Sequence, residues 1–577
     1  MFNPLLMEYQ WKSLEKPHPE TVQKLQKELG INPILCQLLA QREIYDFQTA
    51  KDFFRPSLKQ LYDPFLMQDM DKAVARIDLA KQKGEKLLIY GDYDVDGTTA
   101  VSLLSSFLRK HHPELDIYIP DRYAEGYGVS FQGIDYAKEQ GMTLIIALDC
   151  GIKAVDKVEY ASSLGIDFII CDHHLPGDML PQAVAILDPK RRECNYPYKE
   201  LSGCGIGFKL VQALCQKWHL PKEEWLPLLD LLAVSIGADI VPITGENRIL
   251  AYHGLRMINS RPRPGFALLK ELAGKKDKDL SITDVVFMIG PRINAAGRIS
   301  HGKLAVDLLT GTELDRIEED SLTINDQNTE RRELDRSITA SALSLIEELQ
   351  EQERSATVVF NRDWHKGVIG IVASRLIETY YRPTIVFTES NGKLTGSARS
   401  VPGFDLYQAL ERCGDMLEQF GGHKYAAGMT LQPENFDRFK TAFEEVVTEL
   451  ILPDQKIPTL LIDATVRFSD IQAKFYNILK QFAPFGPGNL SPVFKTDGLM
   501  DTGHSRIVGN DKNHLRLVLQ EPSSGICISG IAFGMANKMD LVLSGRPLSV
   551  LYHLEENEFN GKKGLQLMVK DLKISEY

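Results

Sequence analysis

Short apolar runs alternate with helix-length amphipathic segments over residues 86–188, and this alternation constrains the fold more than any other feature of the sequence. Five runs read as buried strands: KLLIY, LDIYIP, TLIIALD, DFIICD and AVAILD. Helical patterns such as TAVSLLSSFLRKHH and AVDKVEYASSLG lie between most of them. Because strand–helix–strand units join parallel strands through right-handed crossovers, the pattern predicts an α/β fold with a parallel, doubly wound sheet.

The remaining sequence predicts further parts on both sides of this sheet. Residues 1–75 read as an N-terminal segment of short helices, and 76–312 as the domain that contains the sheet. Residues 313–352 are charged with few helix breakers, which predicts one long connecting helix. Residues 353–452 read as a smaller α/β domain. After the breaker ILPDQKIP, residues 453–577 end in the strands HLRLVLQ, ICISGIAF, LSVLYHL and LQLMVKDLKI, which indicate a small antiparallel barrel.

The composition is typical of a soluble globular protein, with 44% hydrophobic and 25% charged residues. The most apolar helix-length stretch carries Asp230 and Asp239, so we expect no membrane-spanning helix, and the N-terminus lacks a signal-peptide pattern. The eight cysteines form no CxxC pair, which favours a reducing, cytoplasmic location over disulfides or structural zinc. The net charge of −12 argues against an overall basic DNA-binding surface, although a local positive channel is compatible with it.

The segment IYGDYDVDG places three carboxylates, Asp92, Asp94 and Asp96, on alternating positions before Gly97. Like charges this close repel one another unless a cation lies among them. The pattern matches half of an EF-hand loop, but Leu103 stands where the loop needs a glutamate and a strand precedes it, which disfavours calcium. Read alone, the segment is also compatible with a solvated acidic turn.

Three more acidic or histidine-containing positions occur near the ends of apolar runs. Asp149 ends one predicted strand, Asp172-His173-His174 follow the next, and Asp239 ends a longer apolar run. Open α/β sheets place their sites at the carboxyl ends of parallel strands. Asp149 alone could cap a turn and His173 alone could be a core histidine. Together, carboxylates and imidazoles suit manganese or magnesium, and two such ions can hydrolyse a phosphodiester. No HExxH motif supports amide hydrolysis instead.

The triplet Asp172-His173-His174, with Asp94-Val95-Asp96 and Asp149, resembles the DHH phosphoesterase superfamily. Further motifs are similar, also in their order, to those of the single-strand-specific 5′→3′ exonucleases of this superfamily: GPRINAAGR (290–298), WHKGVIGIVASRL (364–376), GSARS (396–400), GGHKYAAG (421–428) and APFGPGN (483–489). The resemblance implies a parallel-sheet DHH domain, a long helix, a smaller α/β DHH-associated domain and a C-terminal OB-like β-barrel.

The resemblance also implies a site with two divalent metal ions, manganese or magnesium. The implied metal ligands are Asp92, Asp94, Asp96, Asp149, His173 and Asp239. Among them Asp96 and Asp149 are expected to be shared by both ions. His174 is expected to orient the substrate or protonate the leaving oxygen, so that the implied catalytic residues are Asp96, Asp149, His173 and His174.

Several polar motifs are suited to binding phosphate. Their candidate residues are Arg122, Arg292, Asn294, Arg298, Ser397, Arg399, Gly422 and His423. The GPRINAAGR residues offer forked donors beside small residues, Ser397 and Arg399 alternate on a predicted strand, and Gly421-Gly422-His423 could form an anion nest. Each motif alone is equally compatible with a glycine-rich turn or a surface arginine, and Arg122 could simply pair with Glu125.

The resemblance favours an exonuclease that acts on single-stranded DNA with a 5′ end and releases 5′-mononucleotides in DNA repair and recombination. We expect a monomer, with a helicase and a single-strand-binding protein as candidate partners and no membrane association. One alternative is a phosphoesterase of short oligonucleotides, cyclic dinucleotides or pyrophosphate, although such relatives are shorter and lack the barrel. Another is a catalytically inactive scaffold, which would have no need for clustered acids.

Overall fold

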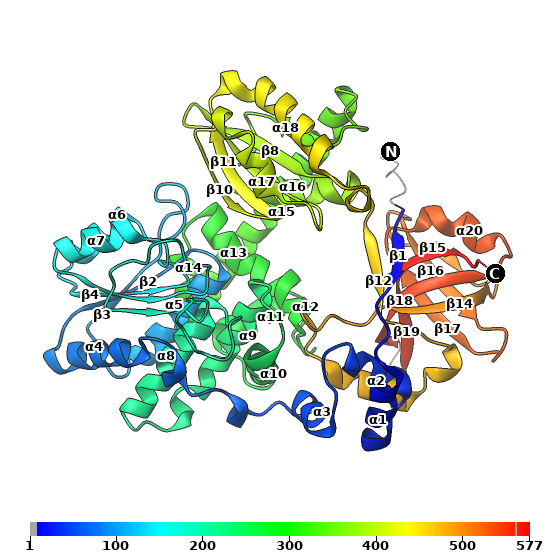
Figure 1. Cartoon of the computed structure of the whole chain (residues 1–577), viewed down its shortest axis with the longest axis horizontal. Helices are drawn as coiled ribbons and strands as arrows, with labels where there is room; N and C mark the ends of the chain where they lie inside the picture. The colour runs from blue at the N-terminus through cyan, green and yellow to red at the C-terminus, as the bar shows by residue number, and fades with distance from the viewer. Residues whose placement is uncertain (1–7, 560–561, 577) are drawn as a thin grey trace. The chain divides into compact units, whose positions relative to one another are not determined.

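The structure is a computed structural model that describes residues 8–559 and 562–576. It divides into two compact units (Figure 1). Of the described residues, one unit contains Thr323–Leu460 with Arg298–Ser300 and residues 8–11, and the other contains Lys12–Gly297, His301–Leu322 and residues 461–559 and 562–576. No helix of the described part is long and apolar enough to cross a membrane.

The predicted parallel sheet is present in the larger unit and contains five strands, all parallel to their neighbours. In spatial order they are β3 (Leu115–Tyr118), β2 (Leu87–Gly91), β4 (Leu144–Leu148), β5 (Asp167–Cys171) and β6 (Ala185–Leu187). Every residue of β2 and β4 is buried, which explains why these strands read as continuous apolar runs.

Helices cover both faces of the sheet (Figure 1). They include α5 (Val95–Leu108), α6 (Phe131–Glu139), α7 (Val155–Ser163) and α8 (Gly203–Lys217). Residues of α6 and α7 share one apolar cluster with the sheet, and α5 and α8 pack on the opposite face. The sheet is therefore doubly wound, as the sequence predicts.

Helix α4 (Met70–Lys83) precedes the sheet, and a helical section follows it. The main helices of this section are α9 (Leu229–Ala238), α10 (Gly245–Ser260), α11 (Pro264–Leu272), α12 (Ile282–Asp284), α13 (Gly290–Ile299), α14 (Lys303–Thr310) and α15 (Leu314–Glu348). A short π-helical turn, Val285–Ile289, precedes α13 and packs against α9. Helix α15, of 35 residues, is the predicted long helix and runs from one unit into the other.

The smaller unit has a mixed sheet of five strands, in which β7 and β8 are parallel and the other neighbours antiparallel. In spatial order they are β10 (Gln419–His423), β11 (Ala426–Leu431), β9 (Lys393–Arg399), β8 (Thr384–Ser390) and β7 (Thr357–Phe360). The helices α16 (Ile369–Thr379), α17 (Leu406–Glu411) and α18 (Phe436–Leu450) pack with it. This unit is the predicted second α/β domain.

The C-terminal strands close into a barrel because β14 pairs with both β18 and β16. Around the barrel the order is β14 (Phe494–Asp501), β18 (Leu548–Phe559), β19 (Lys562–Ile574), β17 (Cys527–Ala532) and β16 (His514–Gln520). The predicted barrel is confirmed, but it is not antiparallel throughout, because the β18–β19 hairpin brings β19 alongside β17 in the parallel direction. The short strands β13 (Ala464–Thr465) and β15 (Arg506–Val508) extend the sheet, and α19 (Ala473–Leu479) and α20 (Met539–Leu543) complete this region.

The N-terminal helices pack against this barrel, which the sequence does not predict. They are α1 (Pro19–Leu29), α2 (Pro33–Ala40) and α3 (Phe47–Phe54). Leu25, Leu35 and Leu39 belong to the same buried cluster as Phe468 and Phe482. An additional strand, β1 (Gln10–Ser13), pairs with β12 (Thr459–Ile462). Buried residues between Leu25 and Ala50 therefore share one hydrophobic core with buried residues between Ala464 and Leu572.

Candidate active site

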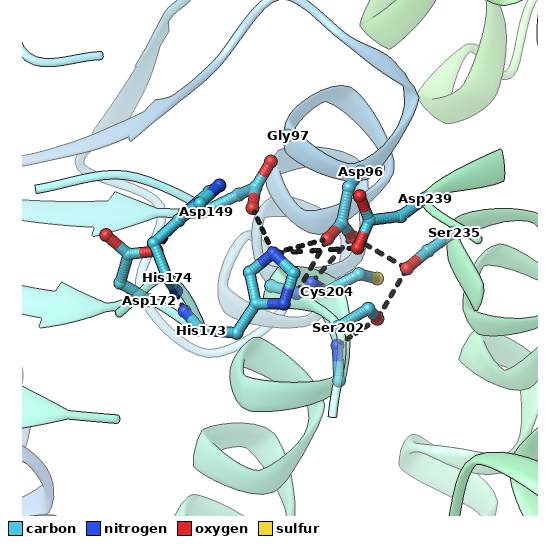
Figure 2. Close-up of polar contacts among 12 residues, drawn as sticks. Asp96, Gly97, Asp149, Asp172, His173, His174, Ser202, Cys204, Ser235 and Asp239 are labelled. Atoms are coloured by element: carbon cyan, nitrogen blue, oxygen red, sulfur yellow. Dashed lines mark hydrogen bonds and ion pairs between the residues drawn. The ribbon is translucent and has the colours of Figure 1, made fainter. Parts of the chain in front are cut away.

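The acids predicted from separate strands meet at the carboxyl edge of the parallel sheet (Figure 2). Asp92 follows β2, Asp149 follows β4, and Asp172 follows β5. Asp239 is the C-cap of α9 and lies beside them, within reach of His173. The common edge arises because parallel strands all end on the same side of the sheet.

His173 lies at the centre of this group. Its Nε2 atom is 3.2 Å from Asp149 Oδ1, 3.5 Å from Asp239 Oδ2 and 3.8 Å from Asp96 Oδ2. Neither ring nitrogen has a hydrogen-bond partner within the described part of the chain, and neither have Asp149 Oδ1 and Asp239 Oδ2. A single N–H cannot satisfy three carboxylates at once. Buried polar atoms left without partners are costly, so the arrangement is suited to holding a cation.

The side chains form two potential metal-binding groups, each with ligand atoms within 4.8 Å of one another. One contains Asp96, His173 and Asp239, and the other Asp149, His173 and His174. His173 is common to both groups, and each group contains one of the two acids, Asp96 and Asp149, that the resemblance implies as shared ligands. Carboxylate and imidazole donors match the preferences of manganese and magnesium.

Asp92 and Asp94 lie beside these groups. Asp94 is the N-cap of α5, and its Oδ1 accepts a hydrogen bond of 3.0 Å from the Gly97 N–H. Asp92 Oδ1 accepts a hydrogen bond of 3.3 Å from the Gly128 N–H, and its Oδ2 has no partner among the described residues. Asp92 therefore keeps one carboxylate oxygen available for an ion.

The electrostatics of the cluster also favour a bound cation. Burial, and then the neighbouring carboxylates, raise the pKa values of Asp92, Asp149 and Asp239 well above the usual range for aspartate. Burial lowers the pKa of His173. Carboxylates buried together disfavour the charged state, and a divalent ion among them reverses this preference.

Asp96 is held by groups that the sequence does not reveal. Its Oδ2 accepts a hydrogen bond of 2.6 Å from the Gly203 N–H, and its Oδ1 accepts from the Cys204 N–H at 2.9 Å and from the Ser235 hydroxyl at 2.7 Å. Gly203 and Cys204 begin helix α8, whose N-terminus favours negative charge. The Ser202 and Ser235 hydroxyls are 2.6 Å apart and complete this network (Figure 2).

Gly203 also leaves room for a second acid. A Cβ atom at this position would lie 2.5 Å from Asp149 Oδ1, closer than real atoms approach. Helix α8 can therefore contact Asp149 only through a glycine. The sequence Ser202-Gly203-Cys204 is typical of the start of a helix, but this local pattern does not indicate that Gly203 lies against Asp149.

Gly97 lets helix α5 begin close to the acids. The helix begins at Val95, two residues before this glycine. Gly97 lies within its first turn, where a Cβ atom would come 2.4 Å from the Asp92 carbonyl oxygen. The glycine allows the first turn of the helix to pack against the backbone of Asp92.

His174 belongs to a separate hydrogen-bonded chain. Its Nδ1 is 2.7 Å from Asp172 Oδ1, and its Nε2 is 3.2 Å from the Tyr127 hydroxyl. Burial alone would raise the pKa of Asp172, but hydrogen bonds from His174 and the Ile152 N–H outweigh it and lower the pKa to about 2. Burial opposes protonation of His174, but Asp172 outweighs it and raises the pKa of this histidine. Asp172 thus fixes the His174 ring and favours its protonated form.

Three of the predicted phosphate-binding residues lie in the same unit as the acids. The Arg122 guanidinium stacks 4.8 Å from the centre of the Tyr93 ring, and its charge acts on Asp92. Arg292 donates to the Met288 carbonyl at 2.7 Å and to the Leu272 carbonyl at 3.1 Å. Two of its donors therefore already bind the protein backbone. Asn294 is half-buried on α13.

The other predicted residues lie in the smaller unit, mostly on one face of its sheet. Strand pairing aligns Arg399 with Ala426 and Ala426 with His423, so these side chains point to the same face. Ser397, two residues before Arg399, shares that face and accepts a hydrogen bond of 3.2 Å from its guanidinium. The face therefore combines the guanidinium of Arg399 and the imidazole of His423 with the hydroxyl group of Ser397.

Gly422 and Arg298 complete the predicted set. Gly422 lies in the edge strand β10 rather than in a loop nest, because Gly421–His423 pair with β11. A Cβ atom at Gly422 would lie 2.3 Å from the Ala426 carbonyl oxygen, so only glycine fits there. Arg298 donates to the Gly367 carbonyl oxygen at 2.8 Å.

Three family models match the chain in the order of its domains. They are the DHH family N-terminal domain at residues 86–236, the DHHA1 domain at 353–449 and the RecJ OB domain at 462–571. The single-stranded-DNA-specific exonuclease RecJ of Bacillus subtilis is 36% identical over 576 residues, which cover 99% of this chain and 72% of the relative. The RecJ of Escherichia coli is 34% identical, over 94% of this chain and 96% of the relative.

Two solved structures extend the likeness to three dimensions. The crystal structure of RecJ from Thermus thermophilus in complex with Mn²⁺ has a TM-score of 0.85 and 26% identity, over 99% of this chain and 80% of that one. The complex of the same protein with Mg²⁺ has a TM-score of 0.79 and 25% identity, over 99% and 79% of the two chains.

The doubly wound sheet with its cluster of acids and histidines defines a metal-dependent phosphoesterase of the DHH class. The DHHA1 and RecJ OB domains accompany this site, and sequence identity to RecJ proteins extends over nearly the whole chain. Both observations indicate one particular family within this class. The chain belongs to the RecJ family.

Proposed function

We propose that this chain is a metal-dependent exonuclease that degrades single-stranded DNA from its 5′ end and releases 5′-mononucleotides. Family membership supports the substrate class, because the RecJ relatives are named single-stranded-DNA-specific exonucleases. The observation that carries the proposal is the buried His173 nitrogen that faces three carboxylates. Such a group is suited to hold cations against a phosphodiester.

The proposed metal ligands are those of the two groups that share His173, with Asp92 and Asp94 beside them. Two bound Mn²⁺ or Mg²⁺ ions would activate a water molecule and neutralise charge on the phosphate. The N-terminus of α8 and the Ser235 hydroxyl fix both oxygens of Asp96, so this carboxylate needs no rearrangement when an ion binds.

His174 is proposed to protonate the leaving 3′ oxygen. Asp172 accepts from its Nδ1–H, which directs the second N–H, on Nε2, toward the Tyr127 hydroxyl. The raised pKa of His174 keeps a proton available on this nitrogen. The role of Asp172 is then to hold the ring and its charge.

The face formed by Ser397, Arg399 and His423 is proposed to bind the 5′-terminal phosphate and to set the polarity of degradation. A guanidinium, a hydroxyl and an imidazole provide several donors for the non-bridging oxygens of one phosphate. Gly370 allows this contact region to form, because a Cβ atom there would lie 2.8 Å from Ser397 Oγ and 2.9 Å from Arg399 Nη2. Arg122, Arg292 and Asn294 are proposed to contact phosphates further along the strand, and Arg298 and Gly422 to support this face.

The C-terminal barrel is proposed to guide the single strand, since OB-type barrels bind single-stranded nucleic acids through stacking and positive charge. The enzyme acts as a cytoplasmic monomer in DNA repair and recombination, with a helicase and a single-strand-binding protein as its partners.

End-labelled single- and double-stranded DNA provide the direct test. We expect the purified chain to degrade the single strand with Mn²⁺ or Mg²⁺ and to be inactive in a chelator, and Asp96→Ala to abolish degradation while the circular dichroism spectrum stays native. Asp178→Ala removes an exposed acid of the same unit and serves as the control. Turnover by Asp96→Ala would refute the metal assignment, and activity restricted to the shortest oligonucleotides would indicate a short-oligonucleotide phosphoesterase.

A second variant tests the phosphate-binding face. Arg399→Ala should weaken binding of 5′-phosphorylated single strands and leave the melting temperature unchanged. Arg412→Ala, which removes a surface arginine of the same unit paired with Glu449, is the matched control. Equal affinity of the Arg399 variant and the wild type would refute the proposed role.

A further inference from the structure

Two exposed aliphatic side chains directly follow residues of the acid and histidine cluster. Leu175 follows His174 and is 62% exposed, and Ile240 follows Asp239 and is 60% exposed. His174 and Asp239 lie on opposite sides of the His173 ring (Figure 2). Tyr127, whose hydroxyl contacts His174, is also exposed. A single exposed apolar residue is ordinary on a protein surface, but here two of them directly follow residues of the cluster and Tyr127 contacts His174, and we call these three side chains the apolar rim.

Ile240 also has an unfavourable backbone conformation. Its φ angle is +60°, in the left-handed region. The other described non-glycine residues with positive φ are Glu43, Asp69, Asp149, His219, Gln350, Asn391 and Lys512, and none of these is β-branched. Branched side chains are especially disfavoured in this region because the Cβ substituents crowd the following carbonyl group.

The position of Ile240 makes this choice of residue harder to explain by folding. It comes directly after Asp239, the C-cap of α9, where a left-handed residue commonly ends a helix and glycine is the usual choice. Glycine would provide the same backbone turn without the steric cost. Because the Ile240 side chain is mostly exposed, burial does not compensate for that cost. The side chain itself therefore calls for another function.

The surroundings of Ile240 indicate what that function is. Ser235 donates to Asp96 and accepts from the Asp239 N–H, so the last turn of α9 connects two acids of the cluster. A phosphodiester held at these acids would bring its nucleoside close to the residues that follow them in the chain, which include Ile240 and Leu175. A nucleobase offers an apolar face, and contacts to that face do not depend on base identity.

We propose that Ile240, together with Leu175, contacts the base of the terminal nucleotide and thereby positions the scissile phosphate in the cluster. The proposal rests on the nuclease function proposed above. It explains why an isoleucine occupies a position at which the backbone favours glycine. It also accounts for binding of the terminal nucleotide without sequence preference.

A double-mutant cycle between the protein and the substrate tests the contact. The protein partners are the wild type and Ile240→Gly, and the substrates are 5′-phosphorylated single strands that end in thymidine or in an abasic tetrahydrofuran residue. We expect Ile240→Gly to raise KM on the thymidine substrate on the order of 10-fold. On the abasic substrate the two proteins should differ by less than about 2-fold, because the contact is already absent.

Equal losses of Ile240→Gly on both substrates would show that the residue acts only through Asp239 and would overturn the proposal, as would no loss on either. A wild type that is inactive on the thymidine strand would instead refute the nuclease function. Leu175→Ala should give the same pattern of effects with a smaller amplitude, and an equal loss on both substrates, or no loss, would refute the proposed contact of Leu175 with the base.

Stability provides a control that is independent of substrate. His219→Gly replaces another residue with a left-handed backbone, just after the C-terminal end of α8, and should leave the KM for both substrates unchanged. In Ile240→Gly the relief of strain offsets the larger freedom of glycine in the unfolded chain, so the apparent melting temperature should stay within about 2 °C. A fall of more than about 5 °C would show that Ile240 packs in the fold and would overturn the proposal.

Discussion

Two groups of buried charge in the same unit differ in how they are neutralised. Glu246 is 1% exposed and accepts from the fully buried Lys209 ammonium at 2.6 Å. It also accepts from the Tyr196 hydroxyl at 2.6 Å and from the Tyr62 N–H at 2.9 Å. Asp149 is 2% exposed and the Asp239 side chain 25% exposed, and each keeps a buried oxygen without a hydrogen-bond partner in the described residues.

The contrast distinguishes structural from functional charge. The Glu246 group contains its own counter-ion, so it can contribute to a fixed architecture without any ligand. The acid cluster repels itself until a cation from outside the protein enters. Asp92, Asp94 and Asp96 are held in place by backbone N–H groups and, for Asp96, a hydroxyl rather than by basic side chains, which leaves their charge available.

The largest difference should come from removing a charge at the cluster. Asp149→Asn should reduce DNA degradation by at least about 1,000-fold, because one metal-binding group loses its carboxylate. Its stability in a chelator should be equal to or higher than that of the wild type, because a repulsive charge is removed. A gel-based nuclease assay and thermal melting in chelator measure the two effects, and activity within about 10-fold of the wild type would contradict the assignment of Asp149.

At the pair of Lys209 and Glu246, removal of a charge should instead lower the stability of the protein. Lys209→Met leaves Glu246 buried without its counter-ion and should lower the free energy of unfolding by about 3–5 kcal/mol. Chemical denaturation measures this loss, which should be independent of divalent ions. Adding Glu246→Gln to the variant should recover part of the stability, and a loss of less than about 1 kcal/mol in the single variant would remove the contrast.

Divalent ions should stabilise one group and leave the other unaffected. At a Mn²⁺ concentration about 100 times its Kd, the wild type should gain about 2.7 kcal/mol over the protein in chelator, as for any ligand of the native state. Asp149→Asn should gain less, and Lys209→Met should gain as much as the wild type. Melting curves at several Mn²⁺ concentrations measure these gains, and identical gains in all three proteins would place the ions elsewhere.

The smallest effect concerns the support of Asp96. Ser235→Ala removes one of its three hydrogen bonds and should raise the Mn²⁺ concentration needed for half-maximal activity by about 10-fold. Activity at saturating Mn²⁺ should recover largely, because the Gly203 and Cys204 N–H groups remain. A Mn²⁺ titration of activity distinguishes this outcome from an unchanged requirement, which would show that Ser235 does not support the ligand.

The sequence predicted those features that follow from local patterns. Strands such as Leu144–Leu148 were recognisable because a strand buried on both faces is apolar throughout. Asp92, Asp149 and Asp172 were recognisable because they directly follow such strands. The support of Asp96 by Gly203 was not, because it joins residues 107 positions apart and Gly203 participates only through its backbone.

Two other features of the structure could not be predicted from local sequence patterns either. The parallel pairing of β17 with β19 depends on where a hairpin docks, which its own sequence does not specify. The left-handed conformation of Ile240 contradicts the preference of its residue type, so a pattern based on preferences cannot reveal it. Sites of this kind are expected where function outweighs local stability.

The shared core of the N-terminal helices and the barrel has a consequence for biosynthesis. Leu35 and Leu39 leave the ribosome long before Phe468, Leu517 and Val550, against whose cluster they are buried. At roughly 5–20 residues per second, about 400 intervening residues take roughly 20–80 s to synthesise. During that interval the nascent helices expose apolar surface of the kind that chaperones bind. Completion of the barrel is therefore the step that ends this exposure for the earliest part of the chain.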